Sequence, residues 1–417
     1  MNHRGENTIG AAGEPLKMLL FNGTFDLDLG GFSTAKVQPA VDEMACLFGL
    51  LGTNEDRQLL AVQLPEYYPI YLRGLGLPFA TPYHESGQTG FSAFPWGWTE
   101  EAVATFRTVG AFAQPPSLKA VRTVNCRKFV HERLVKSGCG VPQSRFCISA
   151  EECAAFIQEG NGRPYVVKPA FGSAGFGFIR TSSTDLTTSQ RNSVSKYIHQ
   201  TGEGVSAEPW LNRTGDLSTS GFITPSGELR DITIHRTLNN RAGAFFAVLL
   251  CRDDPLLKPW REQLVETAKN AAAAAVDAGY FGPVGLDSFL WNDGSRTHLA
   301  PVIEINARHT MSTIARAVRD RLAPKSFCIF RFISRKRHRL PESYHALDER
   351  LGTLAYNPKS KKGILLLSPL RVCHADGRWK QPSRSAFFIS AENEKSALAW
   401  DSALRDLLVQ PKGTAIA

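Results

Sequence analysis

Residues 284–306 read VGLDSFLWNDGSRTHLAPVIEIN, and this stretch decides the fold. Two apolar segments stand on either side of an N-D-G-S turn, so the stretch predicts two strands joined as a hairpin. Because side chains alternate along a strand, Glu304 and Asn306 share one face while the isoleucines beside them face the core. We expect Asp287, on the neighbouring strand, to lie near enough in register to join them.

The chemistry of this cluster is that of hard oxygen ligands. Two carboxylates and an amide oxygen that converge on one face suit Mg²⁺ bridging nucleotide phosphates. Polar Glu-x-Asn pairs also occur on the solvated face of an exposed hairpin. These two strands alone therefore leave both interpretations open.

A second group of functional residues precedes this hairpin. Residues 166–169 read VVKP, and residues 172–177 read GSAGFG, with three glycines in six residues. A lysine on a strand, followed by a glycine loop whose backbone N–H groups turn outward, suits a polyphosphate. The spacing matches neither a P-loop nor a Rossmann fingerprint. A β-hairpin with a glycine-rich turn and a surface lysine explains the same residues, so this segment alone does not decide.

The N-terminal part reads as strands alternating with helices. Residues 15–22 (PLKMLLFN) and 57–64 (RQLLAVQL) predict strands, with a helical pattern between them. This layout implies a βαβ unit and a parallel sheet. From residue 117 helices and strands alternate without internal repeats, which predicts a mixed α/β domain of about 200 residues. The tail beyond residue 320 contains a strand-like segment and a final amphipathic helix.

The composition is that of a globular protein. The chain has 417 residues, of which 43% are hydrophobic and 21% charged, and this excludes a largely disordered chain. No run of about 18 uninterrupted apolar residues occurs, which excludes a membrane-spanning helix. The N-terminus lacks the apolar block of a secretory signal, and the eight cysteines form no C-x-x-C pair. We therefore expect a cytoplasmic protein with reduced thiols.

The positive charge of the chain is local. Most of the net charge of +9 lies in the segment 316–340, which holds nine Lys or Arg against one acid, Asp320. By itself this segment suits nucleic acid, an anionic surface, or a dock for an anionic carrier or peptide substrate. Its short length and few aromatic residues argue against a nucleic-acid partner. A solvated loop explains it equally well.

Taken together, in this order and separation, these segments resemble the ATP-grasp superfamily. The resemblance implies that Lys168 contacts the ATP phosphates and that the glycine loop covers them. It implies that Asp287, Glu304 and Asn306 hold two Mg²⁺ ions, for which Mn²⁺ could substitute. Arg308 matches the arginine that stabilises transferred phosphate or a substrate oxyanion, so Lys168 and Arg308 are the expected catalytic residues. The loop comprises Gly172, Ser173, Ala174, Gly175, Phe176 and Gly177.

Two further segments agree with the resemblance. The family has a first nucleotide-binding cation in a helix ahead of a G-V-P turn; Lys128 fits this position, although Arg127 fits almost equally well. It also has an acidic hinge strand whose backbone meets the adenine, followed here by Asp216. Because Pro209 donates no N–H, adenine contacts in the hinge must use its carbonyl or Leu211. The hinge comprises Glu208, Pro209, Trp210 and Leu211.

The resemblance covers about residues 118–320 and implies an architecture for the whole chain. We expect an α/β (α+β) protein with an N-terminal βαβ pre-ATP-grasp domain, followed by an ATP-grasp fold of two α+β subdomains that clamp the nucleotide. The expected domains are 1–115; 116–320, divided into a lysine and glycine-loop subdomain (116–205) and a metal-binding subdomain (206–320); and a C-terminal extension, 321–417, packed on the core. The role of that extension is left open.

The reaction that the resemblance implies is ligation. In the family a carboxylate attacks the γ-phosphate of ATP, and an amine then displaces phosphate from the acyl phosphate, which forms an amide or peptide bond and leaves ADP. We expect an ADP-forming carboxylate–amine ligase with small-molecule or peptide substrates and no membrane partner; the sequence identifies neither substrate and leaves a homodimer open. Alternatives are an ATP-grasp kinase, a nucleotide-binding regulator without ligation, and binding of an anionic polymer or nucleic acid through residues 316–340.

Three other polar residues lie near the motifs. His235 and Arg236 alternate on an expected strand, so only one of them can face a cleft, and we interpret the strand as a surface strand. His309 directly follows Arg308 and is a weaker candidate for a catalytic base.

Overall fold

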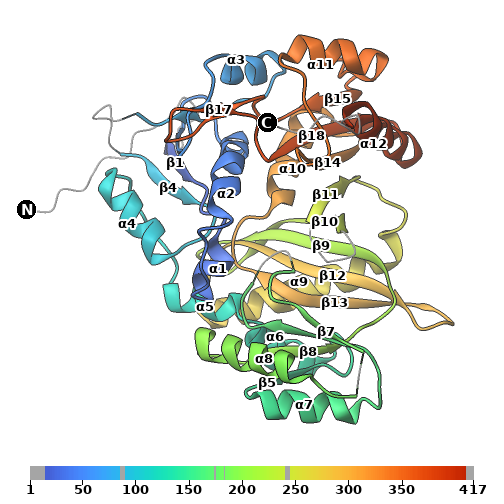
Figure 1. Ribbon diagram of the computed structural model, residues 1–417. Helices are drawn as coiled ribbons and strands as arrows, with labels where there is room; N and C mark the ends of the chain where they lie inside the picture. Colours follow the sequence, from blue (N-terminus) through green and yellow to red (C-terminus); the bar gives the residue numbers. More distant parts are fainter. Residues whose placement is uncertain (1–14, 85–89, 173–174, 183, 240–244, 410–417) are drawn as a thin grey trace, which may run out of the picture.

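The computed structural model describes residues 15–84, 90–172, 175–182, 184–239 and 245–409. These residues form three main sheets with helices packed on them (Figure 1). The N-terminal unit is drawn in blue and cyan, a small sheet in green lies at the bottom of the view, and a large sheet runs from the centre to the top. None of the helices in these ranges has the length and apolarity that a membrane crossing requires.

The N-terminal unit is built on a four-stranded parallel sheet in the order β3-β2-β1-β4. Its strands are β1 (Lys17–Leu20), β2 (Arg57–Leu59), β3 (Thr81–Pro82) and β4 (Ser92–Pro95). Its helices are α1 (Phe25–Leu29), α2 (Gln38–Met44), the 3₁₀ helix Ala45–Leu51, α3 (Tyr67–Gly74) and α4 (Glu100–Thr108). The predicted strands are shorter than expected, but the parallel βαβ arrangement is confirmed.

The small sheet is antiparallel, in the order β5-β8-β6-β7. Its strands are β5 (Arg145–Cys147), β6 (Tyr165–Pro169), β7 (Ile179–Thr181) and β8 (Val205–Pro209). The helices near it are α5 (Leu118–Asn125), α6 (Arg127–Arg133), α7 (Ala150–Glu159) and α8 (Thr188–Thr201). Ser149 begins α7, because its side chain accepts a hydrogen bond from the backbone N–H of Glu152 (3.1 Å). All five residues of β6 are buried, as its apolar sequence predicts.

The large sheet has eight antiparallel strands in the order β13-β12-β9-β10-β11-β14-β18-β15. Its four longest strands are β9 (Arg213–Ile223), β10 (Leu229–Asn239), β12 (Gly282–Asn292) and β13 (Thr297–Asn306). The others are β11 (Phe245–Leu250), β14 (Phe327–Ser334), β15 (Gly363–Leu366) and β18 (Arg384–Ala391). The helices packed on it are α9 (Arg261–Asp277), α10 (Met311–Leu322), α11 (Tyr344–Leu351) and α12 (Glu394–Leu408), and a short hairpin joins β16 (Val372–Cys373) to β17 (Trp379–Lys380).

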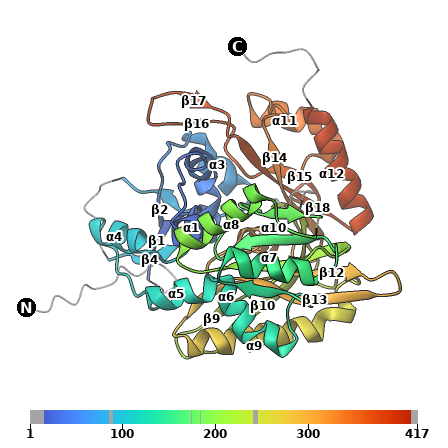
Figure 2. The same ribbon diagram turned by 60° about the horizontal axis from the view of Figure 1, so that its bottom comes forward.

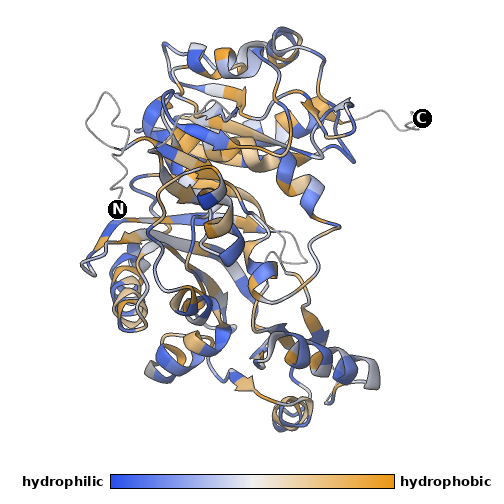
Figure 3. Cartoon of the chain, turned by 90° about the vertical axis from the view of Figure 1, so that its left-hand side faces the viewer, coloured by the Kyte–Doolittle hydropathy of each residue, from blue (hydrophilic) through white to orange (hydrophobic). Residues whose placement is uncertain are grey.

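The two faces of the large sheet have different environments. Helix α9 lies along β9 and β10 (Figure 2) and buries Leu264 against Leu217 and Ile234. The next residues along these strands, Ser218 and His235, are opposite each other in register, and both line a cavity. The helices around the sheets carry both hydrophobic and hydrophilic positions (Figure 3), as amphipathic helices that cover a sheet do.

The expected domain boundaries stay predictions, and two features of the sheets bear on them. The boundary at residue 205 falls inside β8, which pairs with β5 and β6 of the small sheet. Strands β14, β15 and β18 of the segment 321–417 continue the large sheet, because β11 pairs with β14 and β14 pairs with β18. The C-terminal segment is therefore integrated in the sheet that carries the metal-site motif.

Candidate active site

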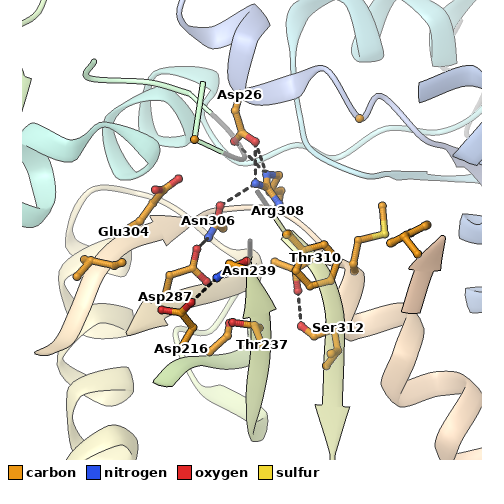
Figure 4. Close-up of a pocket in the computed structure, with 18 of the residues that line it drawn as sticks. Asp26, Asp216, Thr237, Asn239, Asp287, Glu304, Asn306, Arg308, Thr310 and Ser312 are labelled. Atoms are coloured by element: carbon orange, nitrogen blue, oxygen red, sulfur yellow. Dashed lines mark hydrogen bonds and ion pairs between the residues drawn. The ribbon is translucent and has the colours of Figure 1, made fainter. Parts of the chain in front are cut away.

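A cavity of about 300 Å³ lies where the three sheets meet. The N-terminal unit contributes Asp26 and Trp96, the small sheet contributes Lys168, and the large sheet contributes much of the remaining lining. Figure 4 shows the polar side chains of this cavity converging from these elements. A concave site at such a junction, with several charged groups, is the usual form of a ligand site.

The predicted metal ligands lie together on one wall of the cavity. Asp287 on β12 is directly opposite Glu304 on β13, and Asn306 donates from Nδ2 to Oδ2 of Asp287 (3.3 Å). The expected hairpin and its register are therefore confirmed. Burial, and then the negative charge of Glu304, raise the pKa of Asp287 to about 6.

This donor set fits a hard divalent cation such as Mg²⁺. Asp287, Glu304 and Asn306 offer oxygen atoms alone, and a divalent cation would offset the repulsion that raises the pKa of Asp287. Within the described ranges no three His, Cys, Asp or Glu side chains gather as a metal site. The predicted set contains only two such residues, Asp287 and Glu304, and its third ligand is the amide oxygen of Asn306. The assignment of these residues as metal ligands stays a prediction.

Lys168 is held by Glu208 rather than free. The two residues lie on the neighbouring strands β6 and β8, and Lys168 Nζ is 2.6 Å from Glu208 Oε2 with both side chains buried. Burial lowers the pKa of Lys168, although Glu208 opposes this shift. Burial raises the pKa of Glu208, but Lys168 more than offsets this effect, so that pKa is lowered overall. Phe178, also in the cavity lining, has its ring 5.4 Å from Lys168 Nζ.

The rest of the hinge segment makes contacts outside the cavity. The backbone N–H of Trp210 donates to the carbonyl of Pro164 (2.7 Å), so it is not available to an adenine ring in this conformation. Arg180 lies over the Trp210 ring at 4.1 Å, and Leu211 packs near Ile303. Pro209 pairs in register with Tyr165. The cavity lining does not include the four hinge residues, and their adenine role stays a prediction.

The structure buries Arg127, not Lys128, against the predicted metal ligand Glu304. Arg127 is buried at the start of α6, and its guanidinium donates to Glu304 Oε2 (2.5 Å) and to the carbonyl of Pro169 (2.6 Å). The Lys128 side chain is 43% exposed, with Nζ 3.8 Å from Glu203. Lys128 was expected because successive helix residues differ by about 100° in direction and the G-V-P spacing does not distinguish them. Arg127, the alternative residue, is the one that contacts Glu304, and which of the two binds a nucleotide stays a prediction.

The glycine loop is described in part, because Ser173 and Ala174 lie outside the described residues. Gly172, Gly175 and Gly177 have φ values of 155°, 80° and 73°, which favour glycine, as the motif implied. Gly175 lines the cavity. The ring of Phe176 lies 5.1 Å from that of Phe32 in the N-terminal unit. The expected role of the loop as a lid stays a prediction.

Arg308 is bound by an acid that the sequence analysis did not identify. Its guanidinium donates to both carboxylate oxygens of Asp26 in α1 (2.7–3.1 Å) and to Oδ1 of Asn306 (2.7 Å). All three side chains are buried. Asp26 stands in the mostly apolar segment FDLDL. An acidic residue on a helix face that is buried requires a cationic partner, and this was the sequence signal that could have identified Asp26. This contact joins the N-terminal unit to the metal-site hairpin.

Asp216 lies further along the same cavity. It forms an ion pair with Arg213, and its Oδ2 accepts a hydrogen bond from Asn239 Nδ2 (2.8 Å). Thr237, directly opposite Asp216 in register, also lines the cavity (Figure 4). Asp216 thus lines the same cavity as the predicted metal ligands, and its expected role in nucleotide binding stays a prediction.

The interpretation of β10 as a surface strand was wrong at His235. His235 is only 1% exposed and lines the cavity, and neither ring nitrogen has a hydrogen-bond partner of normal geometry among the described residues. Burial, and then the charges of Arg319 and Arg316, lower its pKa to about 3, although the backbone of Thr233 opposes this shift. Arg236 points to the other face, where it pairs with Asp254 (2.7 Å) and Glu394 (2.8 Å).

His309 and the basic segment 316–340 have mainly structural contacts. His309 is buried against the stacked rings of Phe48 and Phe94, with ring centroids 5.5 and 4.9 Å away, and it is absent from the cavity lining. Several cations of the basic segment are used internally, as in the buried pair of Arg331 with Asp401. The exposed cations of the segment are Arg321 and Lys325, before β14, and Arg335, Lys336, Arg337 and Arg339, in the turn after β14. The exposed charge is therefore divided between the two ends of β14.

Known structures resemble this chain over nearly its full length. A phosphoribosylamine–glycine ligase from Thermotoga maritima has a TM-score of 0.54 at 12% identity, covering 94% of this chain and 96% of that one. The biotin carboxylase domain of the 2-oxoglutarate carboxylase from Hydrogenobacter thermophilus, in complex with MgADP, ADP and bicarbonate, has a TM-score of 0.53 at 13% identity, covering 93% and 89%.

A third structure is N5-carboxyaminoimidazole synthase from Aspergillus clavatus, in complex with ADP and 5-aminoimidazole ribonucleotide. Its TM-score is 0.50 at 15% identity, covering 94% of this chain and 98% of that one. No protein-family model matches the sequence, and no curated protein matches it. Likeness at this level of identity establishes the fold and leaves the reaction to the residues of this chain.

Proposed function

We propose, from the premise that the chain has the ATP-grasp fold, that it is an ADP-forming ligase that joins a carboxylate to an amine with ATP and Mg²⁺. One observation carries the proposal. Lys168, Asp287, Glu304 and Asn306, from two different sheets, line a single cavity. The structures that the chain resembles include a phosphoribosylamine–glycine ligase and proteins in complex with ADP or MgADP, which supports ATP as the co-substrate.

The cationic groups suit the binding of the nucleotide phosphates. Lys168 lies on the small sheet and Arg127 begins α6, and each is buried beside a single carboxylate, Glu208 and Glu304 respectively. A triphosphate placed between them accepts charge-assisted hydrogen bonds from both cations. Asp287, Glu304 and Asn306 would hold Mg²⁺, which would neutralise negative charge on the transferred phosphoryl group.

Arg308 holds the reacting groups of the acid substrate in this proposal. Asp26 binds two of its nitrogens and Asn306 binds one, so the direction of the guanidinium is fixed before a substrate arrives. A fixed cation next to the metal ligands stabilises negative charge on the acyl group without reorganisation. An acyl phosphate must be kept from water, and the position of the reacting end between the N-terminal unit and the large sheet reduces the access of water to it.

The proposal is tested by ADP release with panels of carboxylic acids, amines, amino acids and peptides. We expect ADP only with a matched acid, and a condensed product by mass spectrometry only when the amine is added. Lys168→Ala and Glu304→Ala should lower ADP formation by at least about 100-fold, while Glu132→Ala, at an exposed glutamate on α6, should leave it unchanged. ADP formation by Glu304→Ala at the wild-type rate would refute the metal assignment. ADP formed without an amine, and without a condensed product, would identify a kinase instead.

A further inference from the structure

The cavity continues well beyond the predicted metal ligands. From Asp287 on β12 its lining passes over β10, β11 and β14 to Arg384 at the start of β18. This second part is largely apolar on both sides, with walls from the N-terminal unit and from the large sheet. Its apolar side chains include Phe21, Val41, Met44, Phe245, Val248 and Phe332. ATP is predicted to lie at the Lys168 end, so this part of the cavity is free for another molecule.

Among the described cationic side chains that line the cavity, Arg384 alone lacks a carboxylate partner. Four cationic side chains of the described residues line it, and carboxylates bind three of them. These pairs are Lys168 with Glu208, Arg213 with Asp216, and Arg308 with Asp26. Arg384 has no ion-pair or hydrogen-bond partner for its side chain in the described part of the chain. An anionic ligand group would supply the missing partner.

The surroundings of Arg384 add to its positive charge. Arg384 is opposite Ser334 in register, and the next residue, Arg335, donates its backbone N–H to Ser383 (3.0 Å). The exposed basic turn after β14 therefore begins at this rim of the cavity. The carboxylate next to it, Glu43, is already engaged by the backbone N–H of Ser383 (2.6 Å) and by His374 (3.3 Å). An approaching anion thus meets a net positive rim.

His235 marks a second polar contact, nearer to the reacting end. It lies on β10, two strands from β12 in the sheet order, and its side chain is more than nine-tenths buried. Both ring nitrogens lack a hydrogen-bond partner of normal geometry, and an unpartnered buried polar group is a cost that a bound ligand can remove. The neutral imidazole can donate one hydrogen bond to a ligand oxygen or accept one from a ligand N–H.

The separation of these groups sets the length of the ligand. Five steps between adjacent strands separate β12 from β18, and three separate β10 from β18. At roughly 4.8 Å per step these are about 24 Å and about 14 Å across the strands. The register adds a displacement along the strands, because His235 is in line with Ser390 through Leu250 and Cys328, and Arg384 is six residues, or about 20 Å, further along β18. The backbones at His235 and Arg384 are therefore about 24 Å apart, and the two side chains shorten this span. A small amino acid cannot span His235 and Arg384, whereas an extended chain can.

We propose that this part of the cavity binds an elongated co-substrate with an apolar middle segment, whose proximal polar group contacts His235 and whose distal anionic group is bound by Arg384. The inference rests on the proposed function in one respect, because it places the reacting group of this co-substrate at the Asp287 end. It specifies the substrate class as an amphiphilic acid or amine with a remote carboxylate or phosphate.

Calorimetric titration without nucleotide tests the inference on the full chain. The probes are decanedioate, the shorter hexanedioate, and 10-phosphonooxydecanoate, each with magnesium chloride present. We expect both ten-carbon probes to bind at least tenfold more tightly than hexanedioate, with an affinity that falls as salt rises. Tighter binding of the phosphate-bearing probe would identify a phosphate as the distal group, and tighter binding of decanedioate a carboxylate.

Arg384→Ala should weaken both ten-carbon probes at least tenfold, and Arg384→Lys should restore part of the affinity. Lys395→Ala, at an exposed cation on α12 outside the cavity lining, should bind them like the wild type. Arg384 is exposed, so its replacement does not threaten folding. Equal affinity for hexanedioate and decanedioate, no binding of any probe, or an unchanged affinity in Arg384→Ala would overturn the inference.

The outcome is separable from the test of the ligase. ADP formation with some acid, together with failure of the probes, would remove the elongated co-substrate and leave the ligase. Probe binding that depends on Arg384, with no ADP formation from any acid, would remove the ligase and leave the binding site.

Discussion

The two ends of the cavity are constructed in opposite ways. At one end the predicted metal ligands come from residues 287–306, a single hairpin whose two strands are adjacent. At the other end, Met44 comes from α2, His235 from β10 and Arg384 from β18. The comparison teaches that the group of predicted metal ligands is encoded by local sequence, whereas the proposed co-substrate end depends on packing between segments far apart in the chain.

The largest expected effect is on the steady-state kinetics, where a substitution at one end of the cavity should change the turnover number and a substitution at the other end should change the KM. Glu304→Ala should lower the turnover number for ADP formation by about 100- to 1,000-fold, because a charge that acts in the transition state is lost. Arg384→Ala should raise the KM for the co-substrate with little change in the turnover number, because binding far from the reacting atoms is lost. Steady-state kinetics of both variants measures this. The same kinetic change in the two variants would show that the ends do not differ.

The next effect concerns the contact between the N-terminal unit and the metal-site hairpin. Asp26→Asn should lower the free energy of unfolding by about 3–5 kcal/mol, because it leaves the buried Arg308 without its carboxylate. Urea denaturation measures it. Asp28→Asn is the matched control on the same helix: Asp28 is exposed and its carboxylate accepts from Thr24 (2.8 Å), so the loss should stay within about 1 kcal/mol. Equal losses would contradict the account of Arg308.

Two adjacent residues of α6 provide a sharper test of the phosphate end. Arg127→Ala should weaken ATP binding by about 10- to 100-fold, since a charge-assisted hydrogen bond is lost. Lys128→Ala should change it less than about twofold, because an exposed ion pair contributes little. Titration with a non-hydrolysable ATP analogue measures both affinities. The opposite ranking would restore Lys128 as the nucleotide-binding cation.

The smallest expected effect is on the pH dependence of stability. Burial, and then Lys17 and Arg316, lower the pKa of His309 to about 3, against about 6.5 in the unfolded chain. Between these values the unfolded state binds the extra proton, so the stability is fully present above pH 6.5 and is lost as the pH falls towards 3.

The slope from His309 alone is at most about 1.4 kcal/mol per pH unit. His309→Phe, which keeps a ring against Phe48 and Phe94, should remove this contribution from urea denaturation curves measured between pH 5 and 7. His199→Phe, at an exposed histidine on α8, is the comparison variant. An unchanged slope in His309→Phe would mean that another group takes up the proton.

Much of the fold could be read from local patterns. The period-two alternation in β12 and β13 and the turn between them fixed which side chains share a face, and the register agreed. The parallel N-terminal sheet followed from alternating strands and helices. The choice between Arg127 and Lys128 could not be read, because one residue of rotation on α6 decides which side chain is buried.

The sequence by itself determined the chemistry available to this protein: a buried strand lysine, a glycine loop, and carboxylate and amide oxygens on one face of a hairpin. These are short-range properties, since backbone geometry and side-chain alternation act over a few residues. Only the tertiary structure decided that Asp26 binds Arg308, that His235 is buried without a partner, and that Arg384 ends the cavity. Such pairings depend on long-range packing of elements, and the burial that makes them strong or costly exists only after the chain has folded.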